Sequence, residues 1–272
     1  MPDAEFSEFA YGYAVIREAE QLLTRLGKAM TGAPVLPSLI TENTVGYDAN
    51  LVAVDFSLFL QFKRCYFVSA LHRAGTCGFT GGRPHCTWAY WKNPHYRFEA
   101  DTTSNQFHAM RGYEDAVSLG YADGLSVYTA PAFATTADLD SAYQSGAILD
   151  RSVAVLPSAF DPVRKGPHKY SFLPDLSAGV ITSQPVVAAA TPLAELITTT
   201  ARERVPQVRT QPISLRRFAS GLSEQFADTL PEPGAALARA AEQGETGPIL
   251  QALRDTTGYL GGTVLMLGRQ RP

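Results

Sequence analysis

The sequence predicts an α/β fold, in which a mixed sheet is flanked by helices and followed by a helical region. Two features of the apolar pattern support this. In the first half of the chain, segments with apolar residues at every third or fourth position alternate with short segments typical of strands. After the Thr191-Pro192 pair the pattern is helical and is divided by prolines. The 272 residues suffice for one domain and an extension, which we place at residues 1–185 and 186–272.

The chain begins with a predicted helix over residues 5–26. Its apolar side chains recur at spacings of three and four, and Gly27 follows as a stop signal. Residues 31–38 contain one glycine and two prolines, which predict a loop.

Two strands are expected next, over residues 47–54 and 57–63. The short link at Asp55 indicates a hairpin. Residues 66–71 either continue the second strand or begin a helix, and both readings stay open. Residues 74–93 are rich in glycine and end next to a proline, which predicts a long loop.

A strand over residues 96–100, a helix over 104–119 and a strand over 125–130 complete the first half. Ser104 is the expected N-cap of this helix, and Pro131 ends the last strand. The order up to this point is therefore helix, three strands, helix and strand.

The second half begins with two expected strands, residues 152–156 and 168–172. Helices are predicted over residues 193–204, 214–230, 234–243 and 245–257. We expect these C-terminal helices to contact a partner protein or a second copy of the chain.

Composition excludes several classes of protein. Hydrophobic residues make up 45% and charged residues 18%, so the chain can build a core and is not disordered. No run of about 18 apolar residues occurs, which excludes a membrane-spanning helix. The N-terminus lacks the pattern of a secretory signal, and the three cysteines are an odd number. We therefore expect a cytoplasmic protein with no membrane partner.

Charge is unevenly distributed along the chain. Residues 56–98 contain no Asp or Glu but carry six Lys and Arg residues, interleaved with aromatic residues. Such a stretch favours a polyanion with stackable bases, so nucleic acid is the expected partner. The basic side chains assigned to this contact are Arg64, Arg73, Arg83 and Lys92.

The same stretch contains a loop rich in cysteine and histidine. No C-x-x-C pair occurs in it, so we favour a basic binding loop over a zinc site. The residues of this loop are His72, Cys77, His85, Cys86 and His95.

Three polar residues of the expected hairpin point to metal chemistry. Gln61 and Lys63 lie two positions apart, so their side chains leave the same face of a strand. Asp48 starts the preceding strand and comes close to both if the strands pair. Oxygen ligands beside a lysine suit a hard cation such as Mg²⁺ and a water held for attack on a phosphodiester.

This segment resembles the PD-(D/E)XK nuclease superfamily. The matching residues are Gly46-Tyr47-Asp48 and Leu60-Gln61-Phe62-Lys63-Arg64. The pattern is similar to the variant in Mrr-like restriction endonucleases, where Gln replaces the last acidic residue. The family core has the order αβββαβ, which is the order found above. The resemblance covers about residues 5–131 and implies a restriction-endonuclease-like core with a C-terminal helical extension.

The resemblance implies a metal-dependent endonuclease that hydrolyses phosphodiester bonds in a restriction or phage-defence context. DNA is favoured over RNA as substrate, with Mg²⁺ or Mn²⁺ as cofactor. Asp48 would be the central metal ligand, Gln61 and the backbone carbonyl of Phe62 would complete the ligand set, and Lys63 would be the catalytic lysine.

Relatives often add an upstream acid, and two residues compete for this role. We favour Glu42, in the lead-in to the first strand, over Glu18 on the first helix. Gln106 and His108 would reach the same cleft if their helix packs over the sheet. For His108 we favour a structural role.

An alternative function remains. Gln61 contributes no charge, so the chain also fits a catalytically degenerate nuclease fold that binds nucleic acid or scaffolds a partner complex. Convergence of Asp48, Gln61 and Lys63 around an acid-poor cleft would favour the enzyme.

Overall fold

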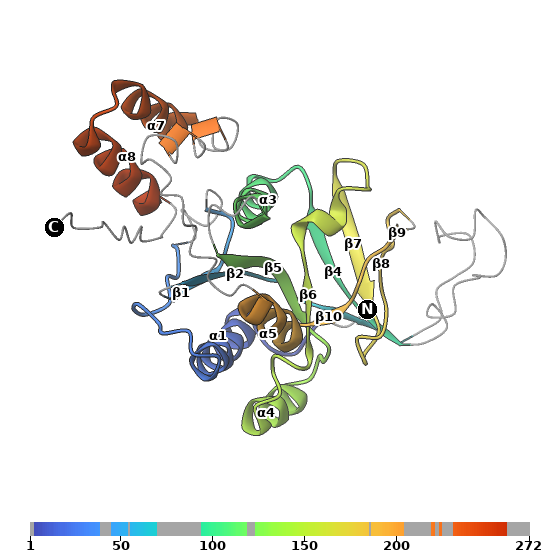
Figure 1. The fold of residues 1–272 in the computed structure, drawn as a ribbon. Coiled ribbons are helices and arrows are strands. Elements are labelled where there is room, and N and C mark those ends of the chain that lie inside the picture. The colour runs from blue at the N-terminus through green and yellow to red at the C-terminus, as the bar shows by residue number, and fades with distance from the viewer. Residues whose placement is uncertain are drawn as a thin grey trace.

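The computed structural model has an α/β fold with two five-stranded sheets and helices packed around them (Figure 1). The predicted fold class, a mixed sheet flanked by helices, is thus confirmed. The structure describes residues 3–38, 45–53, 55–69, 94–118, 123–184, 186–203, 219–220, 223–224 and 231–259.

The first sheet is mixed, and its strands lie in the order β1-β2-β5-β6-β10. β2 and β5 are parallel, and the other neighbours are antiparallel. Their bounds are β1 Ala49–Ala53, β2 Phe56–Phe62, β5 Gly124–Pro131, β6 Ser152–Val155 and β10 Thr191–Pro192.

The second sheet is antiparallel, in the order β3-β4-β7-β8-β9. The strand expected over residues 96–100 is β4 of this sheet, so it does not join β1 and β2, and residues 66–71 begin with a strand, β3. The bounds are β3 Tyr66–Val68, β4 His95–Asp101, β7 Pro167–Phe172, β8 Gly179–Ile181 and β9 Val186–Val187.

The outer edge of β1 is paired instead by part of the expected loop. Two isolated bridges join Met30 to Ala53 and Val35 to Asn50, and Val35 exchanges both backbone hydrogen bonds with Asn50 at 2.9 and 3.0 Å. Proline has no backbone N–H, which keeps this segment from forming a regular ladder.

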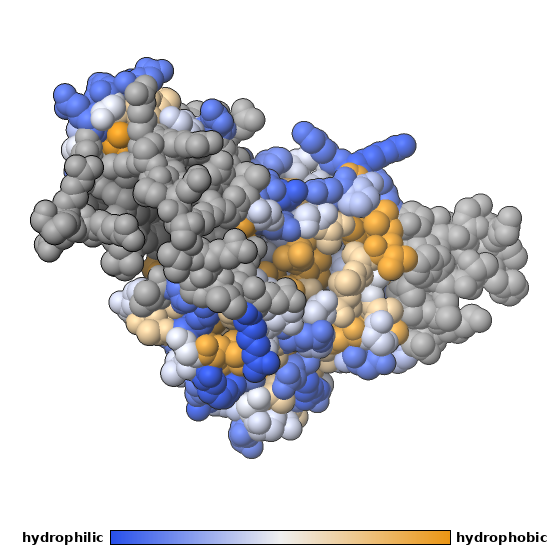
Figure 2. Space-filling model, in the orientation of Figure 1, coloured by the Kyte–Doolittle hydropathy of each residue, from blue (hydrophilic) through white to orange (hydrophobic). Residues whose placement is uncertain are grey.

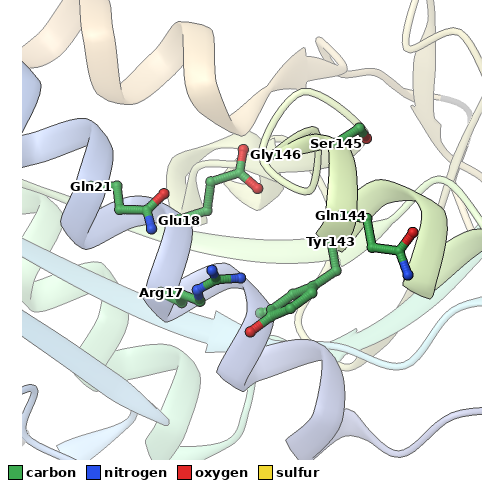
Figure 3. Close-up of a pocket in the computed structure, with 8 residues that line it drawn as sticks. Arg17, Glu18, Gln21, Tyr143, Gln144, Ser145 and Gly146 are labelled. Carbon is green, nitrogen blue, oxygen red and sulfur yellow. The ribbon is translucent and has the colours of Figure 1, made fainter.

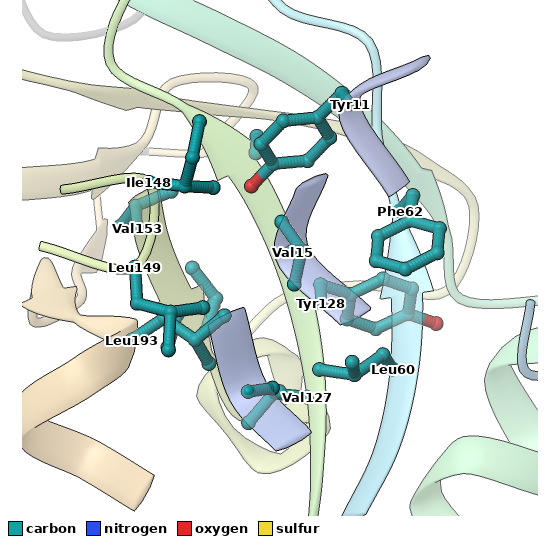
Figure 4. Packing of buried hydrophobic residues seen from close by; sticks show 14 of the residues in the cluster. Tyr11, Val15, Leu60, Phe62, Val127, Tyr128, Ile148, Leu149, Val153 and Leu193 are labelled. Carbon is teal, nitrogen blue, oxygen red and sulfur yellow. The ribbon is translucent and has the colours of Figure 1, made fainter. Parts of the chain in front are cut away.

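Helices cover both faces of the first sheet (Figure 1). On one face α1 (Glu8–Arg25) and α5 (Leu193–Glu203) pack on the central strands. Tyr11 and Val15 of α1 lie against Leu60 and Phe62 of β2, as Figure 4 shows. On the other face α3 (Asn105–Ser118) packs on β5.

Helix α4 (Thr136–Ser145) was not predicted, although its end signals are present. The Thr135 hydroxyl caps its start by accepting from the Asp138 backbone N–H, and Gly146 ends it with φ 66°. The segment is short and largely polar, so it has no clear apolar period.

The core extends beyond the predicted boundary at residue 185. β10 is an edge strand of the first sheet. In α5, Leu193 and Ile197 are fully buried in the same apolar cluster as α1 and β2. A chain cut at this boundary would lose the edge strands β9 and β10, one from each sheet, and a covering helix.

The C-terminal helices α7 (Pro231–Gln243) and α8 (Thr246–Tyr259) pack on each other around a small apolar cluster of their own. Most of the helix predicted over residues 214–230 lies outside the described residues. Of the helices described, none is long and apolar enough to cross a membrane. Apolar residues are visible over β8 and β9 in Figure 2. Val187 of β9 is 68% exposed.

Candidate functional site

Three of the predicted site residues, Asp48, Gln61 and Phe62, meet at one end of the β1–β2 hairpin. Ala49 pairs with Leu60 in the antiparallel register, which places Asp48 opposite Gln61. Their side chains leave the face that α3 covers, because Leu60 and Phe62 leave the opposite face toward α1.

A single amide nitrogen links the three groups predicted as metal ligands. Nε2 of Gln61 donates to Oδ2 of Asp48 at 2.8 Å and lies 3.3 Å from the carbonyl oxygen of Phe62. The backbone N–H of Phe62 also donates to Oδ2 of Asp48, at 2.5 Å. The structure therefore brings Asp48, Gln61 and the Phe62 carbonyl together.

The other end of the Gln61 amide has no hydrogen-bond partner among the residues that the structure describes. Gln61 is 2% exposed, and its Oε1 accepts no hydrogen bond from any described residue. A buried acceptor left unsatisfied costs about 1–3 kcal/mol. This oxygen is the end of the amide that does not contact Asp48, and it would face the carboxylate only if the amide were turned over.

Lys63 lies on the same face, two residues after Gln61. Its backbone N–H donates to the carbonyl of Thr129 at 2.9 Å. Its ammonium donates to Oε1 of Gln106 at 3.1 Å and lies 5.6 Å from the ring centroid of Tyr128. The ammonium is thus held over the sheet, between β5 and α3.

Gly46 allows the segment before Asp48 to approach α3 closely. It has φ 81°, and a Cβ on it would lie 2.7 Å from both the Gln106 carbonyl oxygen and the Ala109 Cβ. Glycine alone tolerates both the backbone angle and the contact.

Tyr128 was not predicted as a site residue. It pairs with Gln61 across the parallel strands β2 and β5 and is 2% exposed. Burial, and secondly the charge of Asp48, raises the pKa of Tyr128 well above its usual value, so its hydroxyl stays protonated. The sequence shows a tyrosine within an apolar strand, which could have marked it as a site residue. The sequence does not show that this strand pairs with β2 and places Tyr128 beside Gln61.

Arg64, assigned to nucleic acid, lies next to the cluster. Its backbone N–H donates to Oε2 of Glu8 at 2.9 Å. Its guanidinium is half exposed and 3.6 Å from Asp3. Arg64 is within the described part of the chain. Four further predicted site residues lie outside it: Glu42, Arg73, Arg83 and Lys92.

Glu18, the other candidate acid, is engaged elsewhere. Its carboxylate accepts from the backbone N–H groups of Ile148 and Leu149 at 2.9 and 3.4 Å. Burial raises the pKa of Glu18 despite these hydrogen bonds. His108 is exposed, and its ring packs beside that of its neighbour Phe107.

A separate polar pocket lies between α1 and α4 (Figure 3). The Arg17 guanidinium lies 4.3 Å from the ring centroid of Tyr143 at this pocket. Glu18 is the one predicted site residue among those that line it. The pocket is thus distinct from the cluster around Asp48.

The donor set at Asp48 suits a hard divalent cation. A carboxylate, an amide oxygen and a backbone carbonyl are the ligand types that Mg²⁺ and Mn²⁺ accept. Oε1 of Gln61 accepts from no described residue, so it would be available to a cation if the amide were turned over. Within the described ranges no group of three or more His, Cys, Asp or Glu side chains could hold a metal, so the ligand set here is mixed.

No protein-family model, no curated protein and no solved structure matches this chain.

Proposed function

We propose that the chain is a metal-dependent nuclease of the PD-(D/E)XK type that hydrolyses phosphodiester bonds, with DNA favoured over RNA. One observation carries this proposal: Asp48, Gln61 and the Phe62 carbonyl meet at one amide nitrogen, with Lys63 on the same face. A D…QxK pattern that occurred by chance would not be expected to bring these groups together in the fold.

The residues have distinct roles in this proposal. Asp48, Gln61 and the Phe62 carbonyl would hold Mg²⁺ or Mn²⁺, which supplies positive charge to a phosphodiester oxygen and acidifies water. Lys63 would orient the attacking water through its ammonium, or would take a proton from that water as the neutral amine, because its side chain is held above the same face of the sheet. The restriction or phage-defence context follows from the family resemblance alone.

The test is cleavage of plasmid DNA and of RNA with Mg²⁺ or Mn²⁺. Wild type should nick or cut DNA, and both Lys63→Ala and Asp48→Ala should reduce the rate by at least about 100-fold, as expected for loss of a catalytic group. Lys165→Ala is the matched control, because Lys165 is exposed on a turn outside the cluster. Equal rates in wild type and Lys63→Ala would reject the proposal.

The second candidate is a non-catalytic module that binds nucleic acid or scaffolds a partner complex. The amide of Gln61 favours it, since its N–H satisfies the Asp48 carboxylate without a cation. DNA binding by wild type that is unchanged by divalent ions, together with no cleavage, would select this function.

A further inference from the structure

The side chain of Gln106 reaches Lys63 from the first turn of α3. Its Oε1 accepts from the Lys63 ammonium at 3.1 Å, although the two residues are 43 positions apart in sequence. Both side chains are half-buried. An amide oxygen is a neutral acceptor, so it orients the ammonium without neutralising its charge.

Lys63 is held along its whole length. At its base, the backbone N–H bonds to Thr129. Along its flank, the ring of Tyr128 lies 5.6 Å from the ammonium, within the range of a cation–π contact. At its tip, the ammonium donates a hydrogen bond to Oε1 of Gln106.

Helix α3 is itself firmly placed on the sheet. The Ser104 hydroxyl caps its start by accepting from the Phe107 N–H at 3.1 Å. The Ser126 hydroxyl of β5 donates to the Met110 carbonyl at 2.8 Å, a buried contact. Gln106 lies between these two anchors, so its position follows from that of the helix.

The same turn of α3 also contacts the segment that carries Asp48. A Cβ at Gly46 would lie 2.7 Å from the Gln106 carbonyl oxygen. One helical turn therefore touches Lys63 through a side chain and the approach to Asp48 through the backbone.

We propose that Gln106 is a positioning residue for Lys63. It holds the ammonium at a set place relative to Asp48 and Gln61, and α3 fixes this arrangement. The inference rests on the proposed function, in which Lys63 acts on the attacking water.

The contact is tested first by a measurement that needs no activity. The Lys63 ammonium should give a slowly exchanging proton–nitrogen NMR signal, assigned by its loss in Lys63→Ala. Gln106→Leu should speed its hydrogen exchange by about 10-fold or more, because the acceptor is lost at similar volume. Gln106→Glu and the exposed control His108→Ala should retain the signal. An unchanged signal in Gln106→Leu would overturn the inference.

Single-turnover cleavage then tests the effect on the reaction. Gln106→Leu should slow cleavage by about 10- to 100-fold, the cost of misplacing a catalytic group, with the Kd for DNA unchanged. Gln106→Glu should restore most of the rate, which a purely structural role would not do. Full activity in Gln106→Leu, or no rescue by Glu, would overturn the role. If wild type cuts nothing, the proposed function fails and the NMR result decides the contact alone.

Discussion

At the scale of single residues, Gln61 determines the charge of the candidate site. Its amide N–H donates to Asp48, and its Oε1 accepts no hydrogen bond within the described part of the chain. A glutamate at this position would place a second carboxylate against Oδ2 of Asp48. Gln therefore suits a site that must stay folded when no cation is bound.

We predict that Gln61→Glu destabilises the protein in EDTA by about 1–3 kcal/mol, because a hydrogen bond is replaced by repulsion between carboxylates. Added Mn²⁺ should reverse the loss. Gln61→Leu should lose less stability in EDTA and gain nothing from Mn²⁺. Urea unfolding with and without Mn²⁺ measures all three proteins. Equal stability of Gln61→Glu and wild type in EDTA would show that the amide does not hold Asp48.

Glu18 provides a pH-dependent prediction. Burial raises its folded pKa above the ordinary value of 4.5, so the folded state binds the proton more tightly than the unfolded state. Wild-type stability should therefore fall as pH rises from that value through the raised pKa. Gln does not titrate, so the stability of Glu18→Gln relative to wild type should rise over the same window.

Chemical unfolding from pH 4 to pH 8 tests this sign. Glu20→Gln, at a partly exposed position of the same helix, controls for the general loss of charge. A relative stability of Glu18→Gln that is flat with pH would contradict the burial of this carboxylate.

At the scale of elements, the close contact between Gly46 and α3 aligns the hairpin with the helix. Alanine at Gly46 must adopt a positive φ, which costs about 1–2 kcal/mol. It must also displace the Gln106 carbonyl and Ala109, which costs roughly a further 1–3 kcal/mol. Gly46→Ala should therefore be strongly destabilised and should weaken the Lys63–Gln106 contact.

Gly27 offers the matched control for this change. Its φ is 77°, but nothing lies within 4 Å of a Cβ placed on it. Gly27→Ala should lose only the stability that a positive φ costs an alanine, about 1–2 kcal/mol. If urea denaturation gives the same loss for both variants, the contact between Gly46 and α3 contributes nothing.

At the scale of the whole molecule, we expect a stable unit that ends after residue 203. A chain of residues 1–203 keeps β10 and α5 and should unfold cooperatively. A chain of residues 1–185 loses the fully buried Leu193 and Ile197, worth about 3–6 kcal/mol together. That is comparable with the total stability of a domain, so this shorter chain should be unfolded by circular dichroism.

A comparison of residues 1–272 with residues 1–203 addresses assembly. The prediction that the C-terminal helices mediate contact with a second copy stays a prediction. Sedimentation should give a higher oligomeric state for residues 1–272 than for residues 1–203. If both proteins are monomers, α7 and α8 would instead contact a partner other than a second copy of the chain.

The local pattern determined most of the helices and strands and the convergence of the site. Alternation of period two puts Gln61 and Lys63 on one face, and a short hairpin returns Asp48 to the same end of the strands. Both features depend on residues close in sequence. They follow from backbone geometry, so sequence alone was sufficient.

Tertiary structure decided what depends on distant pairing. The backbone groups at the edge of a strand are the same in any sheet, so the sequence of a strand does not show which strand it pairs with. It therefore did not show that β4 belongs to the second sheet or that residues 30–35 pair with β1. Glu18 was bound by a loop 130 positions away, and Gln106 met Lys63 only because α3 packs on β5. These contacts form when the core closes, and no local period encodes them.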